Sequence, residues 1–211
     1  MEKENKDKID QYLIYTDILA IFKLGLEIQW KEVRENSVYR ILYLSSVLYS
    51  FRYPSKNNPF NIYKFTVDRS GPYDSNISSA LVFLIKDDYL RRTTGDDVLA
   101  CGKTRSEDVF KIEIGQERYE WLRQVMYILG IYGENKIYDF IFRDPQYQKT
   151  IKSNTQQGLN TDMNNETIKT LKSFQQAFEE TLGKKKETLS SQTYLELYFE
   201  YVFSRILKRK D

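Results

Sequence analysis

Apolar residues along this chain recur mostly at the three- and four-residue spacing of amphipathic helices. This spacing predicts helices over residues 9–28, 116–132, 134–142, 166–182 and 191–208. Residues 37–51 carry apolar groups on nearly every side, which predicts a helix that is buried all round. Asp74 or Ser75 is a suitable N-cap for a further helix that runs through Tyr89. Most of the chain is therefore expected to be helical.

Strand-like patterns are confined to two stretches. The segment NIYKFTV, residues 61–67, alternates between two faces as a strand does. Residues 90–114 combine turn signals at Gly95-Asp96 and Gly102 with β-branched positions, which predicts a β-ribbon. The polar stretch over residues 149–165 is expected to be an exposed loop.

The order helix, helix, strand, helix, β-ribbon is that of a winged helix. We therefore predict a mainly α protein with a small β component. A winged-helix-like domain is expected over residues 1–115, and a helical domain packed on it over residues 116–211.

The Gly71-Pro72 pair lies where the predicted strand turns into the third helix. Proline presets its φ and glycine adopts conformations that other residues avoid, so the pair suits a sharp structural joint. A phosphate-binding loop is the weaker interpretation, because it needs several glycines and a lysine at the helix start. Here a single glycine follows Arg69.

Composition narrows the function classes. The chain has 32 basic and 30 acidic residues, so nucleic-acid binding would have to come from a local patch. It has no histidine, and Cys101 is its one cysteine. A Ser-His-Asp triad and a Cys-His dyad are thereby excluded, and zinc has almost no ligands. We predict no cofactor and no metal.

The compartment is predicted from the same residues. A lone cysteine fits a reducing environment, and the charged N-terminal stretch MEKENKDKID lacks an apolar signal core. No apolar run approaches the roughly 18 residues of a membrane span. We expect a cytoplasmic protein with no membrane contact.

The spacing of the paired aspartates disfavours catalysis by carboxylates. Asp87-Asp88 and Asp96-Asp97 are adjacent pairs, and neighbours in sequence point in different directions on a helix. Aspartate is common in turns and caps, which is the favoured interpretation of both pairs. The chain is therefore predicted not to be an enzyme.

A candidate nucleic-acid surface would combine basic residues before the turn and along the ribbon: Arg69, Arg91, Arg92, Lys103 and Arg105. The favoured alternative is that these are solvated charges, because acidic neighbours such as Asp97 and Glu107 cancel much of the local field. The predicted third helix also offers few groups that could hydrogen-bond base edges.

A candidate partner surface lies on the last predicted helix, which is apolar on most of its circumference. The residues that we predict to contact a partner are Tyr194, Tyr198, Tyr201, Phe203 and Leu207. Aromatic side chains are enriched at protein interfaces, and they equally fill cores. Burial against residues 9–28 and 116–132, and docking of a partner on another face, both remain open.

The segments RILYLSSVLYSF and FTVDRSGPYDSNISSALVFLIKDDYL resemble a family of small prokaryotic proteins. These are the winged-helix-like middle components of three-component systems built around an SMC-like ABC ATPase, of which the Lamassu defence type is the best known. A looser version of the pattern occurs in toxin–antitoxin proteins of the SocA or Panacea kind. The resemblance covers residues 37–114. Tyr73-Asp74-Ser75 stands where the looser pattern has Tyr/Phe-Ser directly.

The resemblance implies a non-catalytic accessory subunit that bridges an SMC-like ABC ATPase and an effector, often a nuclease, in anti-phage or plasmid defence. DNA would then be contacted through the complex. Two alternatives are kept open: a DNA-binding winged helix, and an antitoxin-like protein that masks a toxin.

Overall fold

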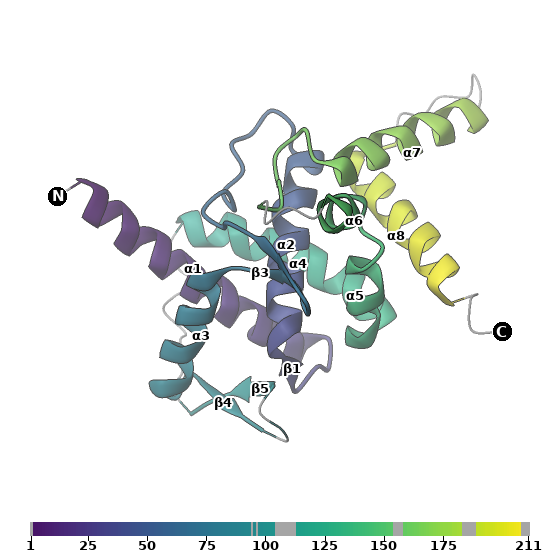
Figure 1. The fold of residues 1–211 in the computed structure, drawn as a ribbon. Coiled ribbons are helices and arrows are strands. Elements are labelled where there is room, and N and C mark those ends of the chain that lie inside the picture. The colour runs from purple at the N-terminus through teal and green to yellow at the C-terminus, as the bar shows by residue number, and fades with distance from the viewer. Residues whose placement is uncertain are drawn as a thin grey trace.

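Helix α2 (Glu35–Arg52) lies at the centre of the fold (Figure 1). The computed structural model describes residues 2–93, 95, 97–103, 113–153, 158–182 and 189–207. Every residue of α2 from Ser37 to Phe51 is buried, which confirms the helix predicted to be covered all round. Such coverage requires neighbours on every side, and the remaining helices supply them.

The helices around α2 form two groups (Figure 1). On one side lie α1 (Glu2–Glu27) and α3 (Ser75–Lys86). The other elements lie behind α2 and on its opposite side: α4 (Glu113–Tyr132), α5 (Glu134–Ile141), α6 (Pro145–Lys152), α7 (Glu166–Leu182) and α8 (Ser191–Leu207). The prediction of a mainly α protein with a small β component is confirmed. One cluster of buried apolar residues extends from α1 to α8, and the predicted boundary between residues 115 and 116 stays a prediction.

A three-stranded antiparallel sheet is formed by β1 (Val33–Arg34), β4 (Leu90–Arg92) and β5 (Val98–Cys101), in the order β1-β5-β4. Together with the helices it gives the element order α1, β1, α2, α3, β4, β5, in which β4 and β5 form the predicted ribbon. The sheet's first strand precedes α2, whereas the sequence pattern placed a strand after that helix. Val33 pairs with Leu99, and both side chains are buried.

The predicted strand over residues 61–67 is mostly wrong. A separate hairpin, β2 (Thr66–Asp68) and β3 (Gly71–Tyr73), begins only at its end. Tyr63 and Phe65, which share one face of the alternating pattern, are both buried. The backbone before the hairpin bonds elsewhere, however: Lys64 N donates to the Asp74 carboxylate, and Phe65 O accepts from Leu159 N at 2.7 Å.

Gly71 is a structural joint. Its φ is +128°, and a Cβ at this position would lie 3.3 Å from Nε of Arg40 on α2. Arg40 Nη2 donates to the carbonyl of Ser70 at 2.6 Å. Three residues later, Asp74 caps α3 by accepting from Asn76 N at 2.7 Å, as predicted. Only glycine allows this close approach with such a backbone conformation.

Two further predictions require correction. Helix α4 begins at Glu113, so Ile114 is helical and does not belong to a ribbon; residues 104–112 lie outside the described residues. The loop predicted over residues 149–165 begins inside α6, where Pro145 occupies the first turn and Asp144 is the N-cap. Proline is favoured at the first turn of a helix and is also common just beyond a helix end. Pro145 was interpreted only as the end of the preceding helix, so α6 was not predicted.

Asp17 on α1 and Arg118 on α4 form an ion pair inside the core. Both side chains are almost fully buried, and Arg118 Nε donates to Asp17 Oδ1 at 2.9 Å. Arg118 also bonds the carbonyl of Pro59 and lies over the ring of Phe60, and Tyr63 donates its hydroxyl proton to Asp17 at 2.6 Å. The network ties α1, α4 and the segment before the hairpin together.

Within the described part of the chain, none of the helices combines the length and apolar content that crossing a bilayer requires.

Candidate partner-binding site

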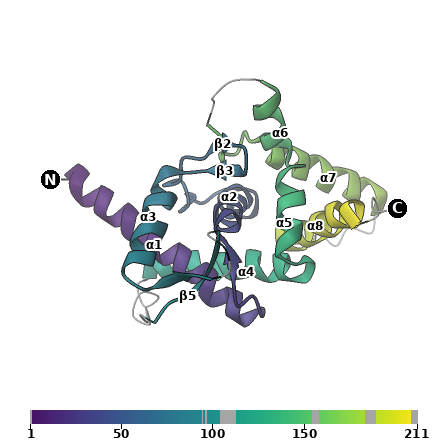
Figure 2. The ribbon, with the colours of Figure 1, turned by 60° about the horizontal axis from the view of Figure 1, so that its bottom comes forward.

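The structure does not bring the predicted basic residues together. Arg69 is exposed in the turn of the β2–β3 hairpin, whereas Arg91 and Arg92 are exposed on β4. The hairpin and the three-stranded sheet lie on opposite sides of α2 (Figure 2). Lys103 is exposed just beyond β5, and Arg105 lies outside the described residues.

The ribbon arginines are engaged within the protein. Arg92 Nη2 lies 3.2 Å from Glu35 Oε2, and Arg91 Nε donates to the carbonyl of Cys101 at 3.3 Å. A phosphate-binding surface needs a cluster of available cations. The exposed residues of helix α3 include the apolar Val82 and Phe83, which offer no group that could hydrogen-bond base edges.

The aromatic residues of α8 lie mainly in the core. Tyr194, Tyr198 and Phe203 are buried. Tyr198 packs edge-on against Phe174 of α7, and Phe203 stacks on Tyr132 of α4 with ring centroids 3.9 Å apart.

The two other predicted partner residues differ. Tyr201 is 41% exposed and lies under the guanidinium of Arg205, whereas the side chain of Leu207 lies outside the described residues. Of the four predicted partner residues whose side chains the structure describes, only Tyr201 is exposed.

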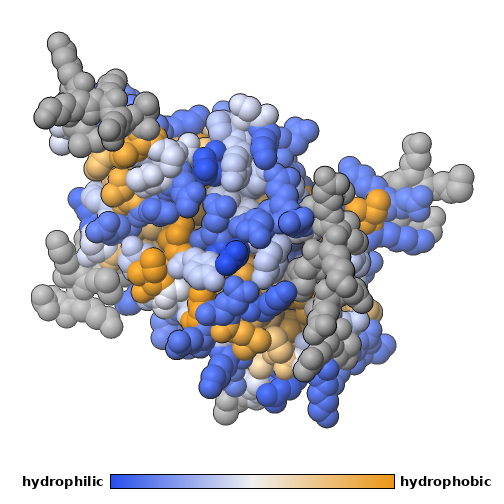
Figure 3. Space-filling model, turned by 180° about the vertical axis from the view of Figure 1, so that it is seen from behind, coloured by the Kyte–Doolittle hydropathy of each residue, from blue (hydrophilic) through white to orange (hydrophobic). Residues whose placement is uncertain are grey.

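A groove of about 480 Å³ opens between α4 and α8. Its apolar lining comes from α2, α4 and α8 and comprises Leu48, Trp121, Val125, Ile128, Leu195 and Phe199. At its edge Ile131 is 77% exposed and Tyr127 is 43% exposed. Figure 3 shows the molecule from behind, the side on which α4 lies, where hydrophobic surface interrupts the polar surface. We call this feature the α4–α8 groove.

The polar residues of the α4–α8 groove are two glutamates, two glutamines and one arginine. Glu120 and Glu196 line it with Gln124, Gln192 and Arg123. The Arg123 guanidinium lies 3.9 Å from Glu120 and 3.9 Å from Glu27 of α1. Glu27 also accepts the hydroxyl proton of Tyr127 at 3.1 Å.

A further carboxylate, Glu200, is exposed one helical turn beyond Glu196 on α8. Burial, and then the nearby Glu200, raise the pKa of the Tyr132 hydroxyl at the end of α4. The surroundings of the groove are therefore acidic.

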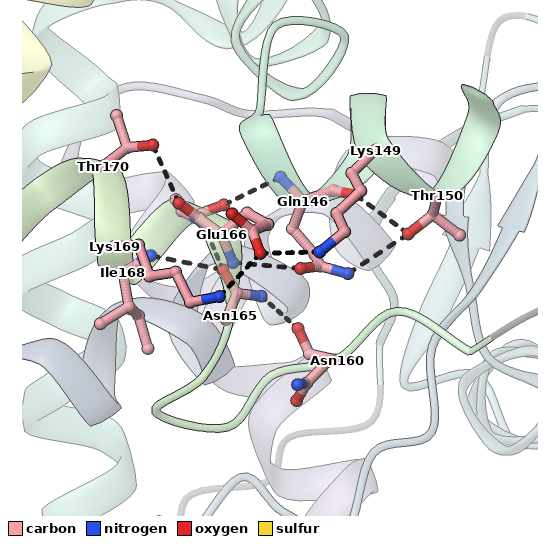
Figure 4. A network of polar contacts seen from close by, with 10 residues as sticks. Gln146, Lys149, Thr150, Asn160, Asn165, Glu166, Ile168, Lys169 and Thr170 are labelled. Atoms are coloured by element: carbon pink, nitrogen blue, oxygen red, sulfur yellow. Dashed lines mark hydrogen bonds and ion pairs between the residues drawn. The ribbon is translucent and has the colours of Figure 1, made fainter. Parts of the chain in front are cut away.

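A polar network fixes α7, the helix on which α8 packs (Figure 4). Asn165 caps α7 by accepting from Thr167 N at 2.7 Å. Glu166 N donates to Gln146 Oε1 of α6 at 3.1 Å, and the Glu166 carboxylate lies 2.8 Å from both Lys149 and Lys169. The groove wall formed by α8 is thereby supported by α6 and α7.

The same junction reaches the central helix. The buried carboxyl of Asp144 accepts from Tyr147 N at 2.9 Å, from the Tyr43 hydroxyl at 2.8 Å and from the Thr167 hydroxyl. Burial nevertheless raises the pKa of Asp144. Because Tyr43 belongs to α2, α6 and α7 are held against the centre of the fold.

Sequence reasoning missed the α4 side of the groove. The helical spacing that predicts this helix comes from Tyr119, Leu122, Val125, Met126 and Leu129. Ile128 and Ile131 follow Gln124 at helical spacing on a neighbouring face. Two isoleucines outside that set were the signal that could have marked this surface.

Of the two acidic pairs considered for catalysis, Asp87-Asp88 lies at the end of α3, and Asp96 of the second pair lies outside the described residues. Asp87 is the C-cap of α3, and Asp88 follows with φ +59°. No group of three or more acidic, cysteine or histidine side chains in the described part of the chain is placed to hold a metal ion.

Comparison of the chain with protein-family models, curated proteins and solved structures returned no match.

Proposed function

We propose that this protein is a non-catalytic interaction subunit that binds a protein partner through the α4–α8 groove. The observation that carries the proposal is the exposure of Ile131 and Tyr127 beside a groove whose deeper apolar residues are buried. Apolar surface of this kind is typical of sites that another macromolecule covers. The buried aromatic residues of α8 contribute by holding one wall of the groove in place.

The partner we propose is an SMC-like ABC ATPase, with the protein bridging it to an effector nuclease in prokaryotic defence. This part of the proposal rests on the resemblance of residues 37–114 to the middle components of such systems. The winged-helix-like order of α1, β1, α2, α3, β4 and β5 supports it. A cytoplasmic location follows from the same proposal.

Direct DNA binding is the less favoured function. The separation of Arg69 from the ribbon and the pairing of Arg92 with Glu35 speak against it. In the proposed role, DNA is contacted by the complex as a whole.

Purification of the tagged protein from its native host, with quantitative mass spectrometry, tests this function. The proposal expects a large coiled-coil ATPase in near-stoichiometric amount. A small toxic protein in its place would establish the antitoxin alternative. Bound DNA without a protein partner would establish the DNA-binding alternative, and either result would overturn the proposal.

A further inference from the structure

We infer that the α4–α8 groove receives an amphipathic helix of the partner whose apolar face is flanked by lysine or arginine. This inference rests on the proposed function, because it specifies the chemistry of the segment that the groove binds. Three observations lead to it: the shape of the groove, the placement of its polar residues, and its charge.

The shape suits a helix. The groove runs between two helices, and its floor is formed by Leu48 of the central helix α2. A third helix laid between two others packs its side-chain ridges into their surface grooves. Amphipathic helices are commonly recognised in this way, with apolar anchors spaced three and four residues apart.

The placement of polar groups disfavours a small molecule. Small-ligand sites have a few polar groups that converge on the ligand and fix its orientation. Here Trp121 Nε1 donates to the carbonyl of Ser45 at 2.9 Å and is therefore occupied. Arg123 is paired with Glu27 and Glu120, and Gln192 donates to Glu196 at 3.3 Å.

The charge specifies the flanks of the partner helix. Glu120 lines the groove and, like Glu27 beside it, is paired with Arg123, whereas Glu196 and Glu200 of α8 add two further carboxylates. Arg123 is the one cation among the described lining residues. Lysine or arginine beside the apolar face of the partner would complement these carboxylates.

A second copy of the chain fits less well. In a twofold dimer the same patch meets itself, so the groove of one copy would face the groove of the other. Such an arrangement would bring the carboxylates of both copies together. Like charges facing each other disfavour an interface.

Synthetic peptides of about 18 residues, or five helical turns, can serve as probes. One peptide carries leucine at helical spacing with lysine elsewhere, and the other has glutamate in place of lysine. The experiment uses the full chain. Trp121 in the groove lining is itself buried, so binding of each peptide is measured by isothermal titration calorimetry rather than by tryptophan fluorescence.

The inference expects the lysine peptide to bind about tenfold or more tightly than the glutamate peptide at low salt. Ile131→Ser should weaken binding about tenfold, because it removes an apolar contact at the groove. Val82→Ser is the matched control, since Val82 is 64% exposed on α3. That substitution should change nothing.

Charge reversal gives a second, independent test. The double variant Glu196→Lys, Glu200→Lys should exchange the preference, so that the glutamate peptide binds more tightly. Glu180→Lys, at an exposed position of α7, is the control and should leave the preference unchanged. Equal binding of both peptides, or binding insensitive to Ile131→Ser, would overturn the inference. So would self-association that Ile131→Ser abolishes, since the occupant would then be a second copy.

The two proposals fail separately. A coiled-coil ATPase that co-purifies equally with the wild type and with Ile131→Ser would leave the bridging role standing and overturn the groove as its site. Lysine-peptide binding with the expected variant effects, without any ATPase from the host, would support the groove chemistry and overturn the proposed function.

Discussion

Gly71 lies against the side chain of Arg40, so close that a Cβ at Gly71 would be 3.3 Å from Arg40 Nε. The contact holds the β2–β3 hairpin on the central helix α2. With the Asp74 cap and the hydroxyl of Tyr147, which donates to the Asp68 carbonyl at 3.0 Å, it places the hairpin between the two groups of helices.

Gly71→Ala should lower the free energy of unfolding by about 1–3 kcal/mol, because alanine is strained at φ +128° and its Cβ crowds Arg40. Gly133→Ala is the matched control. Gly133 also has a positive φ, +85°, but nothing lies within 4 Å of the added Cβ. Urea denaturation of both variants measures the difference. Equal losses would show that the contact with Arg40 contributes nothing.

Asp17→Asn should destabilise the protein by about 3–5 kcal/mol, because it leaves the buried Arg118 guanidinium without its counter-charge. Lys56→Ala provides the comparison, since the Lys56–Glu117 pair at 3.0 Å is exposed. Its loss should change stability by less than about 1 kcal/mol. Denaturant midpoints and slopes measured together would test this contrast, which similar losses in the two variants would contradict.

Glu166 should titrate far below an ordinary glutamate. Hydrogen bonds from Lys149 and Lys169 lower its pKa from 4.5 to about 2. The pKa is lower in the folded state, so any stability that the group contributes is present above pH 4.5 and lost as the pH falls toward 2. Carboxyl NMR titration should show the pKa rising toward 4.5 in Lys149→Ala and further in the double variant with Lys169→Ala. An unchanged pKa would refute the ion-pair geometry of Figure 4.

Duplex DNA should bind weakly or not at all, and without the steep salt dependence of a phosphate-contacting surface. Arg91→Glu combined with Arg92→Glu should accordingly have little effect. Fluorescence anisotropy at low and high salt, with labelled duplex, is the measurement. Tight binding at low salt that the double variant abolishes would favour the DNA-binding alternative.

The sequence correctly predicted those elements whose signals lie within a few neighbouring residues. Helix α7 has the predicted bounds of residues 166–182, and Asp74 is the cap that its position before an apolar-periodic run indicated. The hairpin was missed because β3 consists of Gly71, Pro72 and Tyr73, a composition that indicates a turn. Helix α6 was missed because Pro145 marks both helix starts and helix ends.

The α4–α8 groove could not be predicted because its lining comes from distant parts of the chain. Leu48, Trp121 and Leu195 meet only through tertiary packing. Because α8 is apolar around most of its circumference, the sequence did not show which of its faces would be buried. Tyr198 proved to be buried and Tyr201 exposed, although both are tyrosines on the same apolar helix.

The most direct test of the account compares wild type, Ile131→Ser and Val82→Ser as tagged proteins recovered from the native host, with bound partners quantified by mass spectrometry. The account predicts that wild type and Val82→Ser retain a large coiled-coil ATPase, and that Ile131→Ser, correctly folded by circular dichroism, loses most of it. Equal recovery of the ATPase with all three proteins would contradict the assignment of the α4–α8 groove as the partner-binding site.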